Sequence, residues 1–404
     1  MNRFPCAFAL IVILPALAGC RASSPDAEPL IVSSLLEEMD DGWSPIEPAG
    51  ETTCSDGSDF QFFVRVVDPQ KLVVYFQGGG ACWTGASCAL NGNPTYKPQA
   101  DEQLQSASGI DVEEGTMHGM MAFGHPDNPF TDHSMVFVPY CTGDVHIGNK
   151  VTTYTVEATS ETPAREVTIH HRGYVNAMAA LEWTYVNFLS PNSIFVTGSS
   201  AGAIPSPLYA RFLTEQYPKA RVSVLGDAAG GYRNLLVSDL PHEAWGTLDA
   251  LAHLPEFSEM TADNFNFESL YITSGLRHPG VTFARYDTAE DAVQRRFLAL
   301  GGQQVERLQP LLDANHADIK NQLDHYVSYV APGDSHTILT RPDFYTLEVD
   351  GIAIRDWVED LATGQIVQDV HCGDCADLPS GKQSAPLETV ESSSEPLKFA
   401  SATE

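Results

Sequence analysis

The chain has 404 residues, of which 43% are hydrophobic and 9% aromatic, and its formal net charge is −31. This composition is typical of a globular protein with a sizeable core and excludes a chain that is disordered throughout. No basic stripe is present. So strong a negative charge argues against nucleic acid as a partner and against long-range attraction to an anionic membrane surface or a polyanionic substrate.

The first segment, residues 1–19, has the pattern of an export signal. Arg3 supplies a positive charge, and Ala7 to Leu17 form an apolar run that is too short to span a bilayer. The run ends at Leu17-Ala18-Gly19-Cys20, which resembles the lipobox of bacterial lipoproteins, where the cysteine is acylated and becomes the first mature residue. We therefore expect an exported protein that is lipid-anchored to the cell envelope through Cys20 (to the outer membrane in a Gram-negative cell). A plain signal peptide and a secreted protein are the alternative.

Two further segments flank a single predicted catalytic domain over residues 30–378. Residues 20–29 are mostly small and polar and are interpreted as a tether to the lipid anchor. Residues 379–404 are rich in Ser, Glu, Pro and Ala, a composition typical of a disordered tail.

Strand-like and helix-like patterns alternate within the domain. Short, continuous apolar runs indicate strands buried on both faces over 71–77, 135–140, 193–198, 221–226 and 281–286. Helical spacing predicts helices over 173–189, 203–217 and 288–300, the last with Thr288 and Asp291 in its cap and first turn. This alternation predicts an α/β fold, with a mostly parallel sheet and helices on both faces.

The pentapeptide Gly198-Ser199-Ser200-Ala201-Gly202 is the strongest catalytic signal. It lies between a predicted buried strand and a predicted helix, which is the context that a nucleophile elbow requires. The two glycines allow a sharp turn, and Ser200 would lie at the helix N-terminus, where the dipole favours developing negative charge. Ser200 is therefore the candidate nucleophile, and a glycine-rich turn that caps a helix is the alternative.

A second glycine-rich segment predicts an oxyanion hole. Gln77-Gly78-Gly79-Gly80-Ala81 follows a buried strand, and its three glycines leave backbone N–H groups uncovered. The N–H of Ala201, directly after the nucleophile, would supply a further donor. A phosphate-binding loop is the competing interpretation, but the segment lacks the lysine and the spacing of a P-loop.

The acid of a catalytic triad is expected after the nucleophile in the sequence. Asp287 follows the strand 281–286 and would reach the same sheet edge as Ser200. Asp227, one strand earlier, is a rival, and Asp291 is a weaker one.

The base is expected after the acid. His336 lies in a loop that follows the apolar run 326–330, a position where functional residues are common. The other histidines that follow Asp287 are His316 and His325, in a polar helical stretch, and His371, near the cysteines at the end of the domain.

Export would place the cysteines in an oxidising compartment. Cys6 leaves with the signal and Cys20 would carry lipid, which leaves six of the eight cysteines. An even number suggests three disulfides, although six cysteines allow 15 connectivities. Short loops make Cys82–Cys88 and Cys372–Cys375 natural pairs and leave Cys54–Cys141. A redox or metal pair is the alternative for Cys372 and Cys375.

Several segments resemble, in the same order, the pectin acetylesterase family, which includes the Notum-like carboxylesterases. They extend over roughly residues 36 to 375 and comprise Thr53-Cys54-Ser55-Asp56-Gly57, residues 73–83, residues 135–145, Gly198-Ser199-Ser200-Ala201-Gly202, Ala284-Arg285-Tyr286-Asp287 and Ser335-His336. The resemblance implies an α/β-hydrolase-like fold and hydrolysis of carboxylic esters without a metal or other cofactor. By position, Ser200 matches the family's nucleophile, Asp287 its acid and His336 its base.

The remaining matches concern the surroundings of the triad. Gly79, Gly80 and Ala201 match the family's oxyanion donors, and Cys82 and Cys88 match a short disulfide loop. Asp144 lies in a family motif to which we assign a structural or substrate-orienting role.

We therefore expect a monomeric serine ester hydrolase that removes acetyl or another short acyl group from a carbohydrate. A lipid-type or small-molecule carboxylesterase is one alternative, and a surface lipoprotein that binds carbohydrate without catalysis is another. The net charge makes pectin, itself a polyanion, a less favourable substrate than the family name suggests.

Overall fold

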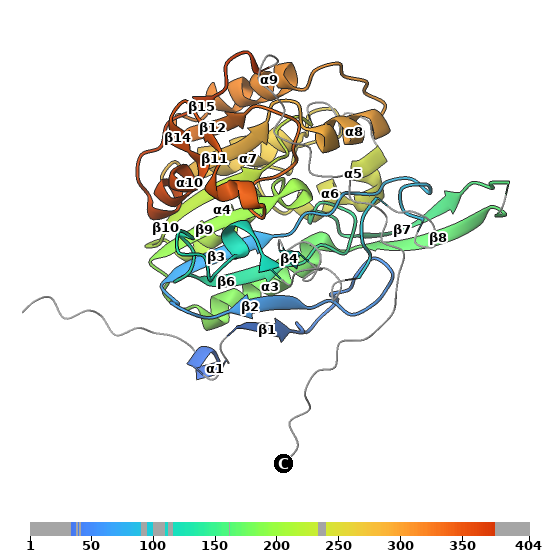
Figure 1. Cartoon of the computed structure of the whole chain (residues 1–404). Coiled ribbons are helices and arrows are strands. Elements are labelled where there is room, and N and C mark those ends of the chain that lie inside the picture. Colours follow the sequence, from blue (N-terminus) through green and yellow to red (C-terminus); the bar gives the residue numbers. More distant parts are fainter. Residues whose placement is uncertain are drawn as a thin grey trace, which may run out of the picture. The chain divides into compact units, whose positions relative to one another are not determined.

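A central sheet of nine strands organises the fold (Figure 1). Its order from edge to edge is β1-β2-β6-β3-β9-β10-β11-β12-β15. The pairs from β6 to β15 are parallel, whereas β1–β2 and β2–β6 are antiparallel. The strands are β1 (Trp43–Ile46), β2 (Phe62–Arg65), β6 (Ser134–Val138), β3 (Lys71–Phe76), β9 (Ser193–Ser199), β10 (Arg221–Asp227), β11 (Thr282–Thr288), β12 (Tyr326–Ala331) and β15 (Val370–His371).

The central strands have both faces buried, which explains their continuous apolar runs. In β3, Leu72, Val74 and Phe76 belong to one core cluster, whereas Val73 and Tyr75 belong to another. Alternate side chains of a strand point to opposite faces, so these two clusters lie on the two sides of the sheet. The predicted α/β fold, mostly parallel with helices, is confirmed.

Helices pack on both clusters (Figure 1). The first cluster includes side chains of α3 (Gly173–Asn187), α4 (Ser206–Gln216), α7 (Phe267–Arg277) and α9 (Gln309–Lys320). The second includes α10 (Ile354–Thr363) and the 3-10 turns η1 (Gly119–Met121) and η3 (Pro342–Tyr345). A third cluster joins residues beside Ser200 to side chains of α5 (Leu240–Trp245), α6 (Thr247–Leu251) and α8 (Ala292–Leu300).

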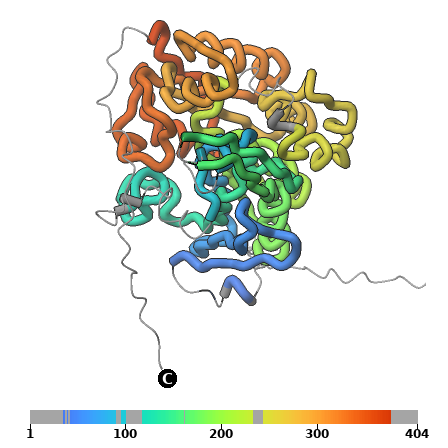
Figure 2. The backbone as a smooth tube through the Cα atoms, turned by 90° about the vertical axis from the view of Figure 1, so that its right-hand side faces the viewer, coloured from blue at the N-terminus to red at the C-terminus, as the bar shows by residue number. Residues whose placement is uncertain are grey.

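A long hairpin stands apart from the sheet. Its strands β7 (Lys150–Val156) and β8 (Arg165–His171) pair antiparallel from Lys150↔His171 to Val156↔Arg165. The hairpin extends well beyond the sheet in Figure 1, and Figure 2 looks along it. Its base is attached near α5, where Thr152 Oγ1 donates to the carbonyl of Ala244. The remaining short elements are α1 (Ser34–Glu37), β4 (Ile110–Asp111), β5 (Thr116–Met117), η2 (Ser200–Gly202), β13 (Glu348–Val349) and β14 (Ile352–Ala353).

One predicted boundary is wrong in a way that matters for the site. The predicted helix over 288–300 begins only at Ala292, because β11 pairs with β12 through Asp287↔Val330 and Thr288↔Ala331. Asp287 is therefore an internal strand residue, and Asp291 is the N-cap of α8. Similarly, α4 begins at Ser206, after the turn η2.

The computed structural model describes residues 34–37, 39, 42–89, 95–99, 110–111, 116–160, 162–232 and 240–375. The predicted signal segment 1–19, Cys20, the tether 20–29 and the tail 379–404 lie outside the described residues. Within the described ranges, none of the helices has the length and apolar character that a membrane span requires.

Candidate active site

Ser200 occupies a sharp turn between β9 and the helical segment that follows. Its φ of +56° lies in the left-handed region, which is unusual for a residue with a side chain. The flanking glycines permit this turn, because a Cβ at Gly198 or at Gly202 would collide with the carbonyl oxygen of Phe76. Strand, strained serine and helix follow one another as in a nucleophile elbow.

The glycine-rich segment after β3 packs directly against this elbow. A Cβ at Gly78 would collide with the backbone of Ser199 and the Cβ of Ser200. Gly79 and Gly80 have φ values of +153° and +91°, and a Cβ at Gly80 would collide with the carbonyl of Thr95. The segment thus needs glycine at these positions, and its backbone comes close to Ser200.

His336 lies in the loop after β12, and its imidazole is paired with Asp291. Nδ1 is 2.7 Å from Asp291 Oδ2. Oδ1 of the same carboxylate accepts the N–H groups of Val293 and Gln294, which makes Asp291 the cap of α8. The other ring nitrogen, Nε2, is buried and has no hydrogen-bond partner among the described residues.

The structure does not bring Asp287 to the histidine as expected. Asp287 Oδ1 accepts hydrogen bonds from the N–H of Gly230 and from Gln294 Nε2, and Oδ2 lies 3.6 Å from His316 Nε2. The reason is that β11 continues past this position and holds the side chain inside the fold, whereas Asp291 lies in the loop beyond. Burial raises the pKa of Asp287 to about 7.

Electrostatics around His336 favour its protonated form. Burial lowers its pKa, but the charge and hydrogen bond of Asp291, together with the charges of Asp227 and Asp287, outweigh burial. The pKa of His336 consequently lies above its usual value.

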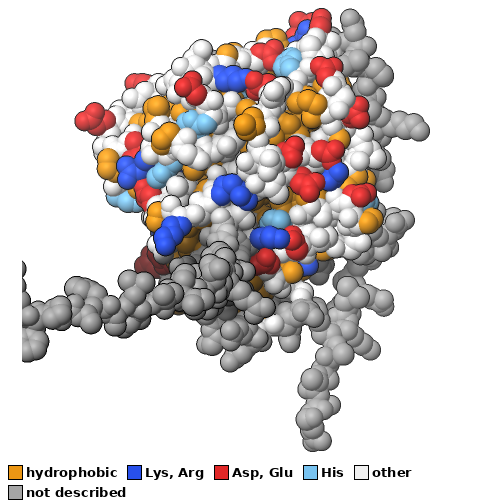
Figure 3. All heavy atoms as spheres, turned by 90° about the vertical axis from the view of Figure 1, so that its left-hand side faces the viewer, with side chains coloured by type: hydrophobic (Ala, Val, Ile, Leu, Met, Phe, Trp, Pro, Cys, Tyr) orange, Lys and Arg blue, Asp and Glu red, His pale blue; other side chains and the backbone are white. Residues whose placement is uncertain are grey.

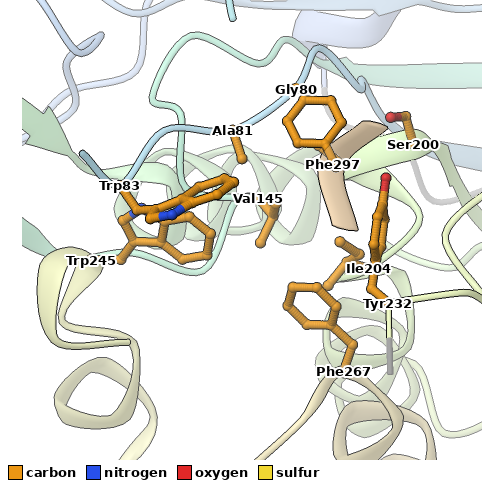
Figure 4. A pocket seen from close by; sticks show the side chains of 11 residues that line it. Gly80, Ala81, Trp83, Val145, Ser200, Ile204, Tyr232, Trp245, Phe267 and Phe297 are labelled. Atoms are coloured by element: carbon orange, nitrogen blue, oxygen red, sulfur yellow. The ribbon is translucent and has the colours of Figure 1, made fainter. Parts of the chain in front are cut away.

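A cavity of about 30 Å³ lies beside the elbow, and its lining is mainly apolar (Figure 4). Ser200 lies on one side of it, and the indole rings of Trp83 and Trp245 lie on the other (Figure 4). The backbone segments of the expected oxyanion hole also reach this cavity. Its lining residues are Gly80, Ala81, Trp83, Val145, Ser200, Ala201, Ile204, Tyr232, Trp245, Phe267 and Phe297.

The predicted disulfides are all present: Cys54–Cys141, Cys82–Cys88 and Cys372–Cys375. Two groups, Cys82–Cys88–His171 and His371–Cys372–Cys375, have metal-like spacing, but their sulfurs are oxidised and are not thiolate ligands.

Asp144 is buried and organises the loop before the hairpin. It accepts hydrogen bonds from Thr142 Oγ1, from the N–H of His146 and from the N–H of Gly173. Burial raises its pKa to about 6. The loop in turn contacts the segment after β3, since His146 Nε2 lies 2.8 Å from the carbonyl oxygen of Gln77. These contacts support the structural interpretation of Asp144.

Sequence analysis names Asp291 as a helix cap and as the weaker rival for the acid, and the structure places it at the N-cap of α8 beside His336. The aromatic lining has no comparable signal in the sequence, because Tyr232, Trp245, Phe267 and Phe297 come from segments far apart in the chain and share no local pattern.

Residues 45–241, which include Ser200 and both glycine-rich segments, match the family model described as Pectinacetylesterase. The palmitoleoyl-protein carboxylesterase notum2 of Xenopus laevis is 26% identical over 99 residues, which are 24% of this chain. The chain aligns with only 19% of the length of that relative.

The fold is similar to that of the Wnt deacylase Notum from Drosophila. The TM-score is 0.51 and the identity 16%, over 81% of this chain and 95% of that one. The resemblance predicted from the motifs is thus confirmed by the family match over residues 45–241 and by the similarity of the fold. Over residues 45–241, the chain is therefore similar to the pectinacetylesterase family.

Proposed function

We propose that the chain is a serine carboxylic ester hydrolase that removes acetyl or another short acyl group from a carbohydrate. The observation that carries the proposal is the small apolar cavity beside Ser200. Its volume is about 30 Å³ on a scale where one water needs roughly 10–15 Å³. It therefore suits an acyl chain of a few heavy atoms.

The proposed mechanism uses Ser200, His336 and Asp291. As Ser200 Oγ attacks the ester carbonyl, His336 Nε2 takes its proton, and Asp291 stabilises the imidazolium through Nδ1. The N–H groups of Gly79, Gly80 and Ala201 stabilise the oxyanion. His336 then protonates the leaving alcohol, and a water activated by the same nitrogen hydrolyses the acyl-enzyme.

The nature of the alcohol follows from the family description and from charge. A pectinacetylesterase domain favours an acylated carbohydrate. On the face shown in Figure 3, Lys and Arg side chains lie among Asp and Glu side chains. The net charge of −31 favours a neutral carbohydrate over a polyanionic one. A lipid-type ester is the second candidate, because the cavity lining is apolar.

Export and anchoring are part of the same proposal. Three disulfides fit an oxidising compartment outside the cytoplasm. Cys20 would carry the lipid. Cys20→Ala should then release the protein from the membrane fraction and abolish labelling by a fatty-acid analogue, and unchanged labelling would contradict lipidation at this residue.

A series of p-nitrophenyl esters from acetyl to palmitoyl tests the function. We expect kcat/KM to be highest for acetyl or propionyl and at least about tenfold lower for octanoyl and palmitoyl. Ser200→Ala is the control and should lower kcat by about 10⁶-fold, as for other triad serines. A rate for Ser200→Ala within tenfold of the wild-type rate would contradict the proposal that the chain is a serine hydrolase. Equal or higher wild-type rates on the long-chain esters would favour a lipid-type ester as the substrate.

A second assay addresses the alcohol. We expect more acetate release from acetylated xylan, which is nearly neutral, than from acetylated pectin at low ionic strength. Salt should narrow the difference, because screening weakens the repulsion of pectin. Absence of release from both polysaccharides would restrict the activity to small esters.

A further inference from the structure

Asp227 ends β10 between the strand that carries the nucleophile and the strand that leads to Asp291. Its Cα is paired with Ser199 in β9 and with Tyr286 in β11. The side chain is fully buried. The proposed mechanism does not use this carboxylate, which accepts hydrogen bonds from Ser199, Ile338 and Leu339 and lies outside the His336–Asp291 pair.

The carboxylate instead binds the residues next to the nucleophile and next to the base. On one side, Ser199 Oγ donates to Asp227 Oδ2 at 2.7 Å. On the other side, the N–H of Ile338 donates to Oδ1 at 2.9 Å, and the N–H of Leu339 donates to Oδ2 at 3.0 Å.

Each of these contacts lies next to a residue whose backbone conformation is strained. Ser200, directly after Ser199, has φ +56°, and Thr337, between His336 and Ile338, has φ +63°. Non-glycine residues hold such angles only where the surroundings fix them. One buried carboxylate therefore anchors both the turn that carries the nucleophile and the turn that carries the base.

In each of these hydrogen bonds, the Asp227 carboxylate is the acceptor. Tyr75 Oη donates to Ser199 Oγ at 2.9 Å, so the serine hydroxyl is left to donate to Asp227. The hydroxyl of Ser199 and the N–H groups of Ile338 and Leu339 all donate to this carboxylate. An ionised carboxylate can only accept hydrogen bonds, so it suits these three donors. An asparagine would turn an amide N–H₂ toward one of these donors and lose at least one bond.

We propose that Asp227 is a positioning residue, which holds the Ser200 elbow and the His336 loop in the relative position needed for proton transfer. The proposal rests on the proposed function of Ser200 and His336. Asp227 touches neither substrate nor the reacting atoms in this scheme, so its effect on turnover should require the presence of His336 as well as Ser200. That requirement separates it from a carboxylate that only stabilises the fold.

A double-mutant cycle with Asp227→Asn and His336→Ala tests this requirement. Turnover of p-nitrophenyl acetate is measured at pH 8, well above the pKa of Asp227, which burial raises to about 6. We expect Asp227→Asn alone to lower kcat by about 100-fold or more with KM within threefold. In the His336→Ala background, the same substitution should change the residual rate by less than threefold.

The outcome that overturns the proposal is an equal loss from Asp227→Asn with and without His336, or no loss in either. If Asp227→Asn does not fold, as thermal unfolding would reveal, Ser199→Ala decides the question. It removes only the contact on the elbow side and should lower kcat about fivefold or more in wild type and not in His336→Ala. Failure of the proposed function itself would look different, because wild type and Ser200→Ala would then have the same rate.

Discussion

Nδ1 of His336 lies 2.7 Å from Oδ2 of Asp291, and the same aspartate caps helix α8. Asp291→Asn separates these roles, because asparagine is also a good N-cap but carries no charge. The imidazolium would lose its stabilising partner and the ring its orientation. We expect kcat for p-nitrophenyl acetate to fall about 10⁴-fold, as when a triad aspartate becomes asparagine, with little change in the melting temperature.

Asp287→Asn is the matched control for that substitution. Both carboxylates are buried and accept a hydrogen bond from Gln294 Nε2, at 2.9 Å for Asp287 and 3.0 Å for Asp291. Only Asp291 pairs with the imidazole, so Asp287→Asn should keep kcat within tenfold of wild type. A loss from Asp287→Asn as large as that from Asp291→Asn would favour Asp287 as the acid.

The raised pKa of His336 predicts the acid side of the pH profile. The base must be neutral to accept the proton of Ser200, and a raised pKa keeps it protonated to higher pH. The value of kcat/KM should therefore rise through an apparent pKa above about 6.5 and level off at higher pH. Asp291→Asn removes a negative charge that raises the pKa of His336. The rise of kcat/KM should therefore move to lower pH in this variant. A wild-type profile already level at pH 6 would contradict the assignment.

Much of the fold could be predicted from the sequence, and the reason for the one important error is physical. Strands such as β3 and β9 are buried on both faces, so their apolar runs mark them clearly. The end of β11 is different, because Tyr286, Asp287 and Thr288 continue the parallel pairing with β12 although their side chains include polar groups. Local pattern could not show this tertiary pairing, which keeps Asp287 within the strand and leaves Asp291 to pair with His336.

The aromatic lining of the cavity is harder to predict from local sequence patterns than the strands are. The glycines and Ser200 form contiguous motifs, because a sharp turn and bare N–H groups need adjacent residues. Trp245 lies on α5 and Phe297 lies on α8, and both side chains line the cavity. In the sequence, each of them has the pattern of an ordinary apolar residue of its helix. Their common role depends on how these helices pack beside the elbow.

The three disulfides should differ in their contribution to stability. Cys54–Cys141 spans 87 residues, whereas Cys82–Cys88 spans 6 and Cys372–Cys375 spans 3. Closing a longer loop restricts the unfolded chain more, which predicts a loss of about 4–5 kcal/mol for the double serine variant of Cys54–Cys141 and about 2 kcal/mol for either short loop. Urea unfolding of the three double variants measures this order. A greater loss from a short loop would show that native contacts dominate over chain entropy.

Phe297 is the cavity residue whose removal should change the acyl preference. It lies on α8, is partly exposed, and borders the space beside Ser200 (Figure 4). Phe297→Ala would lengthen a cavity of about 30 Å³ without touching the proposed triad or the oxyanion donors. We expect the ratio of kcat/KM for hexanoyl to that for acetyl p-nitrophenyl ester to rise at least about tenfold. Val186→Ala, on the exposed side of α3 with 66% of the residue accessible, is the control and should leave the ratio unchanged. An unchanged ratio in Phe297→Ala would mean that the acyl chain lies elsewhere, and the short-acyl preference would then need another explanation.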